Sequence, residues 1–364
     1  MSVPAASFPP HSLTARFAAR AARRQWRERW LGRGLRGLSL LLALLLLALP
    51  LFLLFNARID DAWREALLPL LAGSFKAALY AMLVALPLGL GAAIWCARFA
   101  TPGLRGLLKP VFELFEAVPA VVLGLIAALI LAPWLAQRVL GLVLLLALLP
   151  LLALAAGWLW QRLAPAGWQR FWRGREIGLL LPLAALLVPL ALGLGQAPLF
   201  ASFAAQLQPA SPWNGLVIGL MLGLATMPVI FTLAEDALFA VPADLATGAQ
   251  ALGATRWQAL WRLVLPVAAP GIAAAVLLGF SRALGETMIV LMASGNTPLL
   301  QVSPLSGLRS VAANLALEAP DAVRGSVHYG QLLFSALLLF GLCLLLNALA
   351  EGVRARLRQR LAGS

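Results

Sequence analysis

Long apolar runs limit what this chain can fold into more than any other feature of the sequence. The hydrocarbon core of a bilayer is about 30 Å thick, so about 20 apolar residues cross it as one helix. Only 12% of the residues are charged, and the apolar runs show no strand-like alternation. The sequence therefore predicts an all-α polytopic membrane protein. Roughly eight transmembrane helices are expected, near residues 37–55, 73–96, 111–133, 139–160, 177–195, 214–234, 267–293 and 329–350.

Basic residues are concentrated on one side of this predicted topology. They precede the first run and follow the second, fourth, sixth and eighth, whereas the other connections hold few cations and several acids. Short cytoplasmic loops carry an excess of Lys and Arg. We therefore expect both termini in the cytoplasm. The representative cations are Arg16, Arg20, Arg23, Arg27, Arg33, Arg98, Arg105, Lys109, Arg162, Arg170, Arg256, Arg262, Arg354 and Arg358.

The net charge of +14 does not indicate a nucleic-acid partner, because these cations flank membrane spans, where topology and anionic lipid account for them. The two lysines, Lys76 and Lys109, lie outside any phosphate-binding loop of the G-x-x-x-x-G-K-[ST] type. The two cysteines fall in or at the ends of predicted spans, which suits packing. The sequence predicts no catalytic residue, no metal site, no cofactor and no nucleic-acid partner.

A charged connection, residues 236–266, follows the sixth apolar run. Gly253 can adopt the positive φ that ends a helix, and Thr255 with Gln258 forms a capping-box pattern for the next helix. Pro266 is expected to end this second helix or to begin the seventh span. The pattern predicts a helix–turn–helix element, which either lies passively at the membrane surface or docks onto a partner protein.

Two charges fall in the seventh predicted span. Arg282 and Glu286 are four positions apart, so a continuous helix places them on one face. A charge at the bilayer centre costs about 2.5 to 3.5 kcal/mol on insertion scales and normally faces a bundle interior or a water-filled path. The pair is either a structural ion pair or part of an anion path in which Arg282 contacts the anion and Glu286 neutralises it. Neighbouring hydroxyls and amides could add donors: Ser281, Thr287, Ser294, Asn296 and Thr297.

The third predicted span begins with an acidic pair, Glu113 and Glu116. We interpret these carboxylates as capping a helix start or reaching to the membrane surface.

At these motifs the chain resembles binding-protein-dependent ABC transporter permeases. Gly253, nine further residues, Leu263, one residue, Leu265 and Pro266 resemble the spacing of the "EAA" loop of that family. The octapeptide Ala-Leu-Gly-Ala-Thr-Arg-Trp-Gln at 251–258 and the run Ser-Arg-Ala-Leu-Gly-Glu-Thr-Met at 281–288 are similar to phosphate permeases of the PstC type. Met288 and Ile289 stand where Ala-Pro usually follows Gly-Glu-Thr in the sister PstA subunits. The resemblance covers residues 73–135 and 214–352.

This resemblance implies a MetI-like type I importer core and a place as one half of a two-permease phosphate pore in the bacterial inner membrane. The implied partners are a PstA-like sister permease, a PstB-like cytoplasmic ATPase dimer and a PstS-like periplasmic phosphate-binding protein, besides membrane lipid. Arg282 and Glu286 match the family's transport residues, with Ser281 and Thr287 beside them in the expected substrate path. The residues expected to couple to the ATPase are Ala249, Gly253, Ala254, Thr255, Leu263, Leu265 and Pro266.

Two departures from the family pattern are present. Thr247 replaces the glutamate that names the loop, and Gly248 replaces its first alanine. Residues 136–196 form an apparent extra hydrophobic hairpin, expected either to face lipid or to dock another subunit. The expected organisation is a basic segment over 1–36, a first span and periplasmic loop over 37–72, the permease domain over 73–352, which includes the 236–266 coupling loop, and a basic tail over 353–364.

Three alternatives stay open at this stage. The substrate could be another oxyanion such as sulfate, molybdate or phosphonate. The chain could be a signalling or scaffold subunit that has lost transport, in which case Arg282→Ala would leave its function intact. An ion-driven secondary carrier would need no ATPase, but the sequence shows no inverted repeat that supports it.

Overall fold

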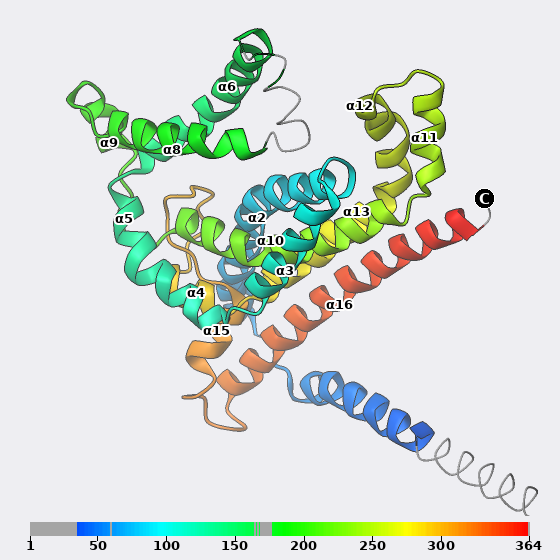
Figure 1. Cartoon of the computed structure of the whole chain (residues 1–364). Helices are drawn as coiled ribbons and strands as arrows, with labels where there is room; N and C mark the ends of the chain where they lie inside the picture. The colour runs from blue at the N-terminus through cyan, green and yellow to red at the C-terminus, as the bar shows by residue number, and fades with distance from the viewer. Residues whose placement is uncertain (1–34, 59, 164, 166, 168–176, 363–364) are drawn as a thin grey trace, which may run out of the picture. The chain divides into compact units, whose positions relative to one another are not determined.

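The computed structural model describes residues 35–58, 60–163, 165, 167 and 177–362. They belong to two units, which divide between Ala57 and Arg58 (Figure 1). In the first unit, a helix runs over Leu35–Asn56, and only 6% of its most apolar window is buried. Apart from Leu53, which is 8% exposed, the leucines of this helix are exposed, as expected of a helix that lipid surrounds. The interfacial helix expected over 17–36 falls almost entirely outside the described residues.

The second unit is built around two long helices, α2 (Asp61–Arg98) and α10 (Gly215–Phe239), which have the most extensive contact between helices in the described part of the chain. Small residues allow this contact. Ala77, Ala78 and Ala81 of α2 are at most 1% exposed, and a Cβ added at Gly223 of α10 would lie 2.7 Å from the Cβ of Val84. Lipid is as apolar as the helices, so close backbone approach drives helix association in membranes.

Two further helices complete the bundle. The helix α13 (Leu265–Gly285) packs on α10 and on α2, and the 36-residue helix α16 (Val327–Ala362) packs along α13 (Figure 1). The main buried cluster draws its side chains from α2, α4, α10, α13 and α14, so it occupies the centre of the second unit.

The third predicted span is not one helix. It is divided between α3 (Pro102–Glu116) and the helical run α4 (Ala120–Ile126), η1 (Ala127–Leu131) and α5 (Ala132–Ala136), and the two parts meet at 85°. The break lies at Ala117, Val118 and Pro119. Proline disfavours helical backbone at the residue before it, so the chain turns at Val118. The residues on both sides of this break are apolar, so hydropathy predicted a single span.

The seventh predicted span is also shorter than expected. The helix α13 ends at Gly285, and Glu286 has extended backbone with ψ 126°. A six-residue helix, α14 (Met288–Ala293), follows, and then the 294–310 connection leads to α15 (Val311–Glu318). This connection is fixed to α2: the ammonium of Lys76 donates a hydrogen bond to Ser306 Oγ at 2.6 Å, and Val311 N donates to Ser74 Oγ at 2.9 Å.

In the region of the expected extra hairpin, α6 (Val139–Leu163) packs against α8 (Ile177–Leu194), and the short helices η2 (Pro198–Phe200) and α9 (Ala201–Gln206) follow. The tryptophan-rich loop between α6 and α8 lies outside the described residues.

Among the described residues, five helices are long and apolar enough to cross a membrane, or seven if each of two bent pairs counts as one span. This confirms an all-helical polytopic protein. The expected count of eight is not confirmed, because within α6 the described apolar stretch covers only Val139–Leu148, which is too short to count as a span.

Candidate functional site

Arg282 lies in the last turn of α13 and is exposed. Its Nη1 is 3.7 Å from Oε1 of Glu116, the last residue of α3, and the two side chains are 46% and 41% exposed. The two charges thus lie at one end of the α3–α13 contact, with part of each open to the surroundings. A pair of this kind is loosely held, because each partner keeps access to solvent.

Glu286 does not share a helical face with Arg282, because α13 ends at Gly285. Its Oε1 accepts hydrogen bonds from the N–H groups of Thr287 and Met288, at 3.1 and 3.2 Å. These N–H groups begin α14 and have no partner inside that helix. The expected pairing of Arg282 with Glu286 is therefore wrong in this conformation: the arginine contacts Glu116, and Glu286 caps the next helix.

The hydroxyls of Ser281, Thr287 and Ser294, expected beside these charges, already donate hydrogen bonds within the chain. Ser281 is 6% exposed and donates to the carbonyl of Cys343 on α16 at 3.5 Å, so it lies toward α16. Thr287 donates to the carbonyl of Gly285 at 3.4 Å. Ser294 is fully buried and donates to Asn296 Oδ1 at 3.2 Å. The structure brings Arg282 and Glu286 near one chain break, but Ser281 belongs to a helix–helix contact.

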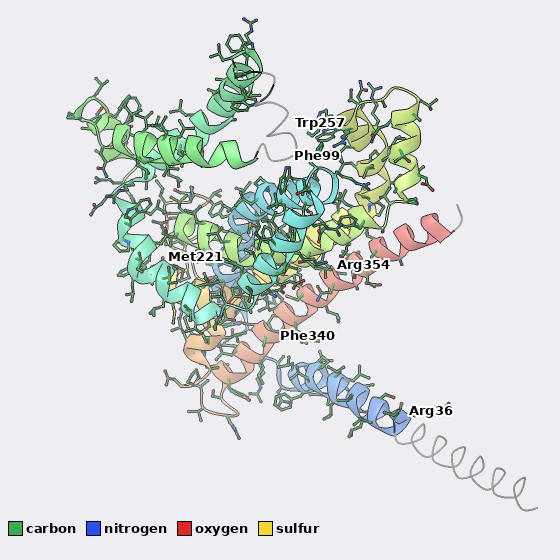
Figure 2. The ribbon with its side chains drawn as sticks, viewed as in Figure 1. Arg36, Phe99, Met221, Trp257, Phe340 and Arg354 are labelled. Carbon is green, nitrogen blue, oxygen red and sulfur yellow. The ribbon has the colours of Figure 1, made fainter. Side chains whose placement is uncertain are left out.

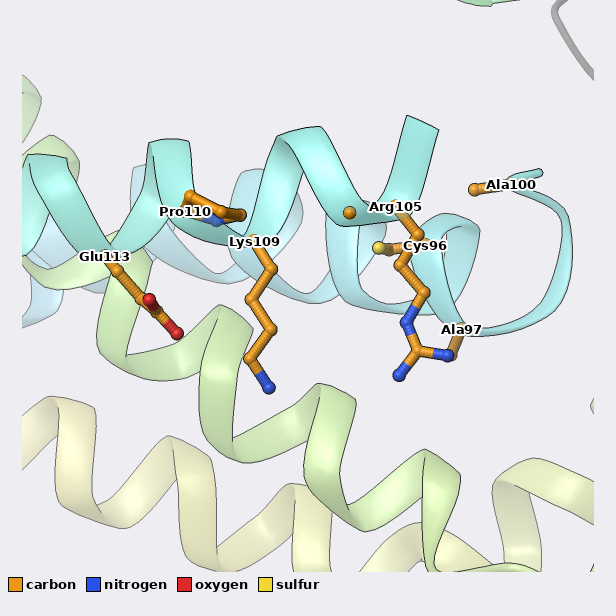
Figure 3. A pocket seen from close by; sticks show the side chains of 8 residues that line it. Cys96, Ala97, Ala100, Arg105, Lys109, Pro110 and Glu113 are labelled. Carbon is orange, nitrogen blue, oxygen red and sulfur yellow. The ribbon is translucent and has the colours of Figure 1, made fainter. Parts of the chain in front are cut away.

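The helix α3 carries its charges along one face. Arg105, Lys109, Glu113 and Glu116 follow spacings of four, four and three residues, which keeps them within a narrow arc of a 3.6-residue helix. The opposite face holds Leu107, Val111 and Leu114, which are 62%, 51% and 71% exposed. Figure 3 shows Arg105, Lys109 and Glu113 pointing from α3 toward the ribbon of α10. The charged face is thus directed into the protein and the apolar face outward.

The charged face of α3 meets a buried carboxylate. Glu235 of α10 is 0% exposed, with Arg105 Nε 3.4 Å from its Oε1 and Lys109 Nζ 3.6 Å from its Oε2. The thiol of Cys96 donates to the same Oε1 at 3.4 Å. A buried charge removed from its partners is strongly destabilising, so these contacts fix α3 to α10 at this point. A cavity of about 500 Å³ lies beside them, lined by residues that include Cys96, Arg105, Lys109 and Glu113.

The end of α10 receives two further cationic contacts. The guanidinium of Arg105 lies 3.5 Å from the ring centroid of Phe239, the last residue of α10, and Arg98 Nη2 donates to the carbonyl of Leu238 at 2.7 Å. Lys109 Nζ is also 3.9 Å from Asp236 Oδ1. We call Arg105, Lys109 and Glu235 the α3 clamp. It holds α10 only a few residues before the next helix begins.

The 236–266 segment contains the helix–turn–helix that the sequence predicts. The helix α11 (Ala243–Ala251) ends before Gly253, which has φ +91°, and α12 (Arg256–Ala259) begins with the complete capping box of Thr255 and Gln258. Thr247 donates to the carbonyls of Ala243 and Asp244 at 3.3 Å each, so its hydroxyl is directed back to its own helix.

Pro266 neither ends α12 nor starts a separate span. A π-helical turn, η3 (Leu260–Val264), joins α12 to α13, and one helix runs over Arg256–Gly285. Proline has no N–H to donate and its ring clashes with the carbonyl four residues earlier. The wider π turn directly before Pro266 accommodates both effects, so the helix continues.

The α11–α12 hairpin projects beyond the end of α13 and leaves much of its surface uncovered (Figure 1). At its tip Leu252 is 92% exposed. Of the residues expected to couple to an ATPase, Ala249, Ala254 and Leu265 are partly buried, whereas Gly253, Thr255, Leu263 and Pro266 are exposed. The ring of Trp257 lies 6.3 Å from that of Phe99, which follows α2, and so braces the hairpin from one side (Figure 2).

Glu116 and Glu235 are the residues that sequence reasoning missed. Glu116 was interpreted as a cap or a surface carboxylate, and Glu235 was given no role. The regular spacing of Arg105, Lys109, Glu113 and Glu116 was a usable signal, because four charges on one helical face require a polar surface opposite. The contact between Glu116 and Arg282 depends on the bend after α3, which no local pattern shows.

The fold and these charges define a class: a multi-pass helical membrane protein with an exposed helical hairpin at one end and a half-open ion pair inside. Residues 85–359 match the protein family described as "Binding-protein-dependent transport system inner membrane component". The chain belongs to this family of transporter permeases, and the expected family resemblance is confirmed.

Several relatives support this assignment at low identity. The chain is 26% identical to "Probable ABC transporter permease protein YqgH" of Bacillus subtilis, over 82% of this chain and 74% of that protein. It is 28% identical to "Phosphate transport system permease protein PstC" of Xylella fastidiosa, over 78% and 71% of the two chains. The match to "Phosphate transport system permease protein PstC 1" of Mycobacterium tuberculosis is 27%, over 79% and 72%.

Proposed function

We propose that this chain is the PstC-like permease subunit of an ABC importer and forms half of the membrane pore for inorganic phosphate. The name of the relatives from X. fastidiosa and M. tuberculosis supports phosphate as the substrate. The single structural observation that carries the proposal is the half-exposed guanidinium of Arg282, held by one carboxylate at 3.7 Å. Guanidinium presents a planar set of donors that matches phosphate oxygens, and a partly open one can exchange its partner.

Arg282 contacts the anion in transit without holding it tightly. A deep binding site would slow release into the cell, so a conduction site must bind weakly enough to let go. Glu286 directs its carboxylate to the start of α14 and so fixes the backbone just beyond Arg282. In this proposal Glu286 shapes the path, while Arg282 is the group that meets phosphate.

Energy comes from a separate cytoplasmic ATPase dimer, because neither lysine of the chain lies in a phosphate-binding loop. The exposed α11–α12 hairpin is the surface that docks onto this ATPase, with Leu252 at its tip. The sister permease supplies the other half of the pore, and a periplasmic phosphate-binding protein delivers the substrate. The chain then lies in the bacterial inner membrane with both termini in the cytoplasm, as the distribution of its arginines supports.

The test is phosphate uptake by vesicles that hold this chain, its sister permease and the ATPase, supplied with the binding protein. We expect uptake that requires ATP and that Arg282→Ala abolishes. Sulfate, molybdate and phosphonate are assayed in parallel. Uptake of one of these and not of phosphate would replace the substrate, and ATP-dependent phosphate uptake untouched by Arg282→Ala would remove the arginine from the path. An assembled complex that transports none of them would favour the signalling alternative.

A further inference from the structure

The helix α3 contacts both parts of the proposed transport machinery. In the first half of this helix, Arg105 and Lys109 hold Glu235, seven residues before Pro242, which directly precedes α11. At its last residue, Glu116 holds Arg282. These contacts come from one helical face and from a helix of only 15 residues. Whatever displaces α3 at one end therefore displaces it at the other, because a short helix moves as a unit.

The contact at Glu235 and the contact at Glu116 differ in how easily they break. Glu235 is fully buried between two cations and a thiol, so its contacts are costly to break. Glu116 and Arg282 are each almost half exposed and 3.7 Å apart, so their contact opens easily. A displacement of α3 thus opens the Arg282 pair before it breaks the α3 clamp.

We propose that Glu116 is a positioning residue for transport: it occupies Arg282 while the pathway is closed, and α3 withdraws it when the ATPase moves the 236–266 segment. This inference rests on the proposed function. Glu116 and phosphate are alternative anionic partners of the same guanidinium. While Glu116 is in place, its carboxylate neutralises the guanidinium of Arg282 and so weakens its attraction for the anion, and the withdrawal of Glu116 restores that attraction. ATP binding is thereby linked to the affinity of the pathway for the substrate.

The groups around Arg282 leave Glu116 as the one carboxylate that pairs with it among the described residues. Glu286 is directed to the N–H groups of α14, and Glu113 lies near the cavity beside the α3 clamp. Glu113 therefore provides a matched control: the same residue type, on the same face of the same helix, one turn away.

The first experiment measures phosphate efflux without ATP from loaded vesicles that contain the whole complex. Removing the competing carboxylate leaves Arg282 open at all times. We expect Glu116→Gln to raise passive efflux about tenfold, which corresponds to about 1.4 kcal/mol. Glu116→Asp and Glu113→Gln should stay as tight as the unaltered chain. Equal efflux from Glu116→Gln and Glu113→Gln would overturn the proposal. It would mean that losing the carboxylate beside Arg282 has no more effect than losing another carboxylate on the same face of α3.

The second experiment does not depend on the substrate. Cys96 and Cys343 are replaced by alanine, and cysteines are placed at 116 and 282 (Glu116→Cys with Arg282→Cys) for a short bifunctional thiol reagent. We expect cross-linking in the nucleotide-free complex and its loss when the ATPase is trapped with ATP and vanadate. With Glu235→Gln added, cross-linking should persist in both states, whereas Asp236→Asn should leave the loss intact. Cross-linking that never changes with nucleotide, or that Glu235→Gln does not affect, would overturn the connection through α3.

These arms separate two kinds of failure. A complex that transports no phosphate but loses its cross-link on trapping refutes the proposed substrate and supports the role of α3. A complex that imports phosphate yet keeps its cross-link in every state supports the proposed function and refutes this inference.

Discussion

Two glutamates of this chain show how burial decides what an ion pair can do. Glu235 has no exposed surface, so removing its cations would strand a charge in the interior at a cost of several kcal/mol. Glu116 and Arg282 keep 41% and 46% of their side chains exposed, and pairs in such surroundings contribute about 0 to 1 kcal/mol. The first pair holds two helices together, and the second can open during a transport cycle.

We expect Arg282→Lys and Arg282→Ala to differ in their rates of phosphate uptake. Arg282→Ala removes the charge and should reduce ATP-driven phosphate uptake by at least about a hundredfold, the size expected when a charge-assisted contact worth about 3 kcal/mol is lost. Arg282→Lys keeps a point charge but loses the planar pair of donors, so uptake should be partly retained. Initial uptake rates in vesicles, compared at equal protein levels, measure both. Identical rates for the two variants would show that the charge at this position does not matter, and rates equal to that of the unaltered chain in both would show that Arg282 does not contact the anion.

At the scale of single elements, local rules predicted well and longer-range contacts did not. The positive φ of Gly253 and the capping box of Thr255 with Gln258 follow from steric and hydrogen-bonding rules that act within a few residues. The expected face shared by Arg282 and Glu286 required a helix that continued past Gly285, and that helix ends there. The proposed transport roles of these residues, and the docking role of the 236–266 segment, stay predictions.

The turn between α11 and α12 provides a prediction for this element. Nothing lies within 4 Å of a Cβ added at Gly253, so Gly253→Ala costs only the strain of φ +91°, about 1 to 3 kcal/mol. We expect the hairpin to shift and ATPase binding to weaken, which pull-down of the ATPase with the assembled permease pair measures. Gly248→Ala, within α11 and equally open, is the control and should bind normally. Normal binding by both variants would show that this turn does not set the docking geometry.

At the scale of the whole molecule, hydropathy indicated a polytopic helical protein but misplaced the ends of its spans. It treats 111–133 and 267–293 as single segments, whereas the chain bends after Glu116 and the helix α13 ends at Gly285. Both breaks place charged residues near helix ends, where Glu116 and Arg282 meet. The site could not be assembled from the sequence, because its two partners come from helices whose relative placement depends on the packed core.

The tightest part of that core provides a prediction for the whole fold. At Gly223 an added methyl would lie 2.7 Å from the Cβ of Val84 and 2.8 Å from the carbonyl oxygen of Ala81. Gly223→Ala should separate α2 from α10 and lower the free energy of unfolding by about 1 to 3 kcal/mol. Thermal unfolding of the purified protein in detergent measures the change. Gly91→Ala, on α2 with nothing within 4 Å, should be neutral or slightly stabilising, and a similar loss in both variants would contradict this account of the packing.

The open side of the Arg282–Glu116 pair also has a consequence for how a cell makes this protein. In the proposed pore the exposed parts of these two charges face a water-filled path, whereas in a subunit inserted alone they would face hydrocarbon, which is costly enough to mark the subunit as incomplete. We therefore expect the orphan chain to be short-lived, and synthesis of its sister permease at the same time to extend its lifetime, as pulse–chase labelling would measure. A long lifetime without the sister would mean that water or the chain itself already shields the pair. The amount of this subunit in the membrane would then depend, through one ion pair, on the amount of sister permease that the cell makes.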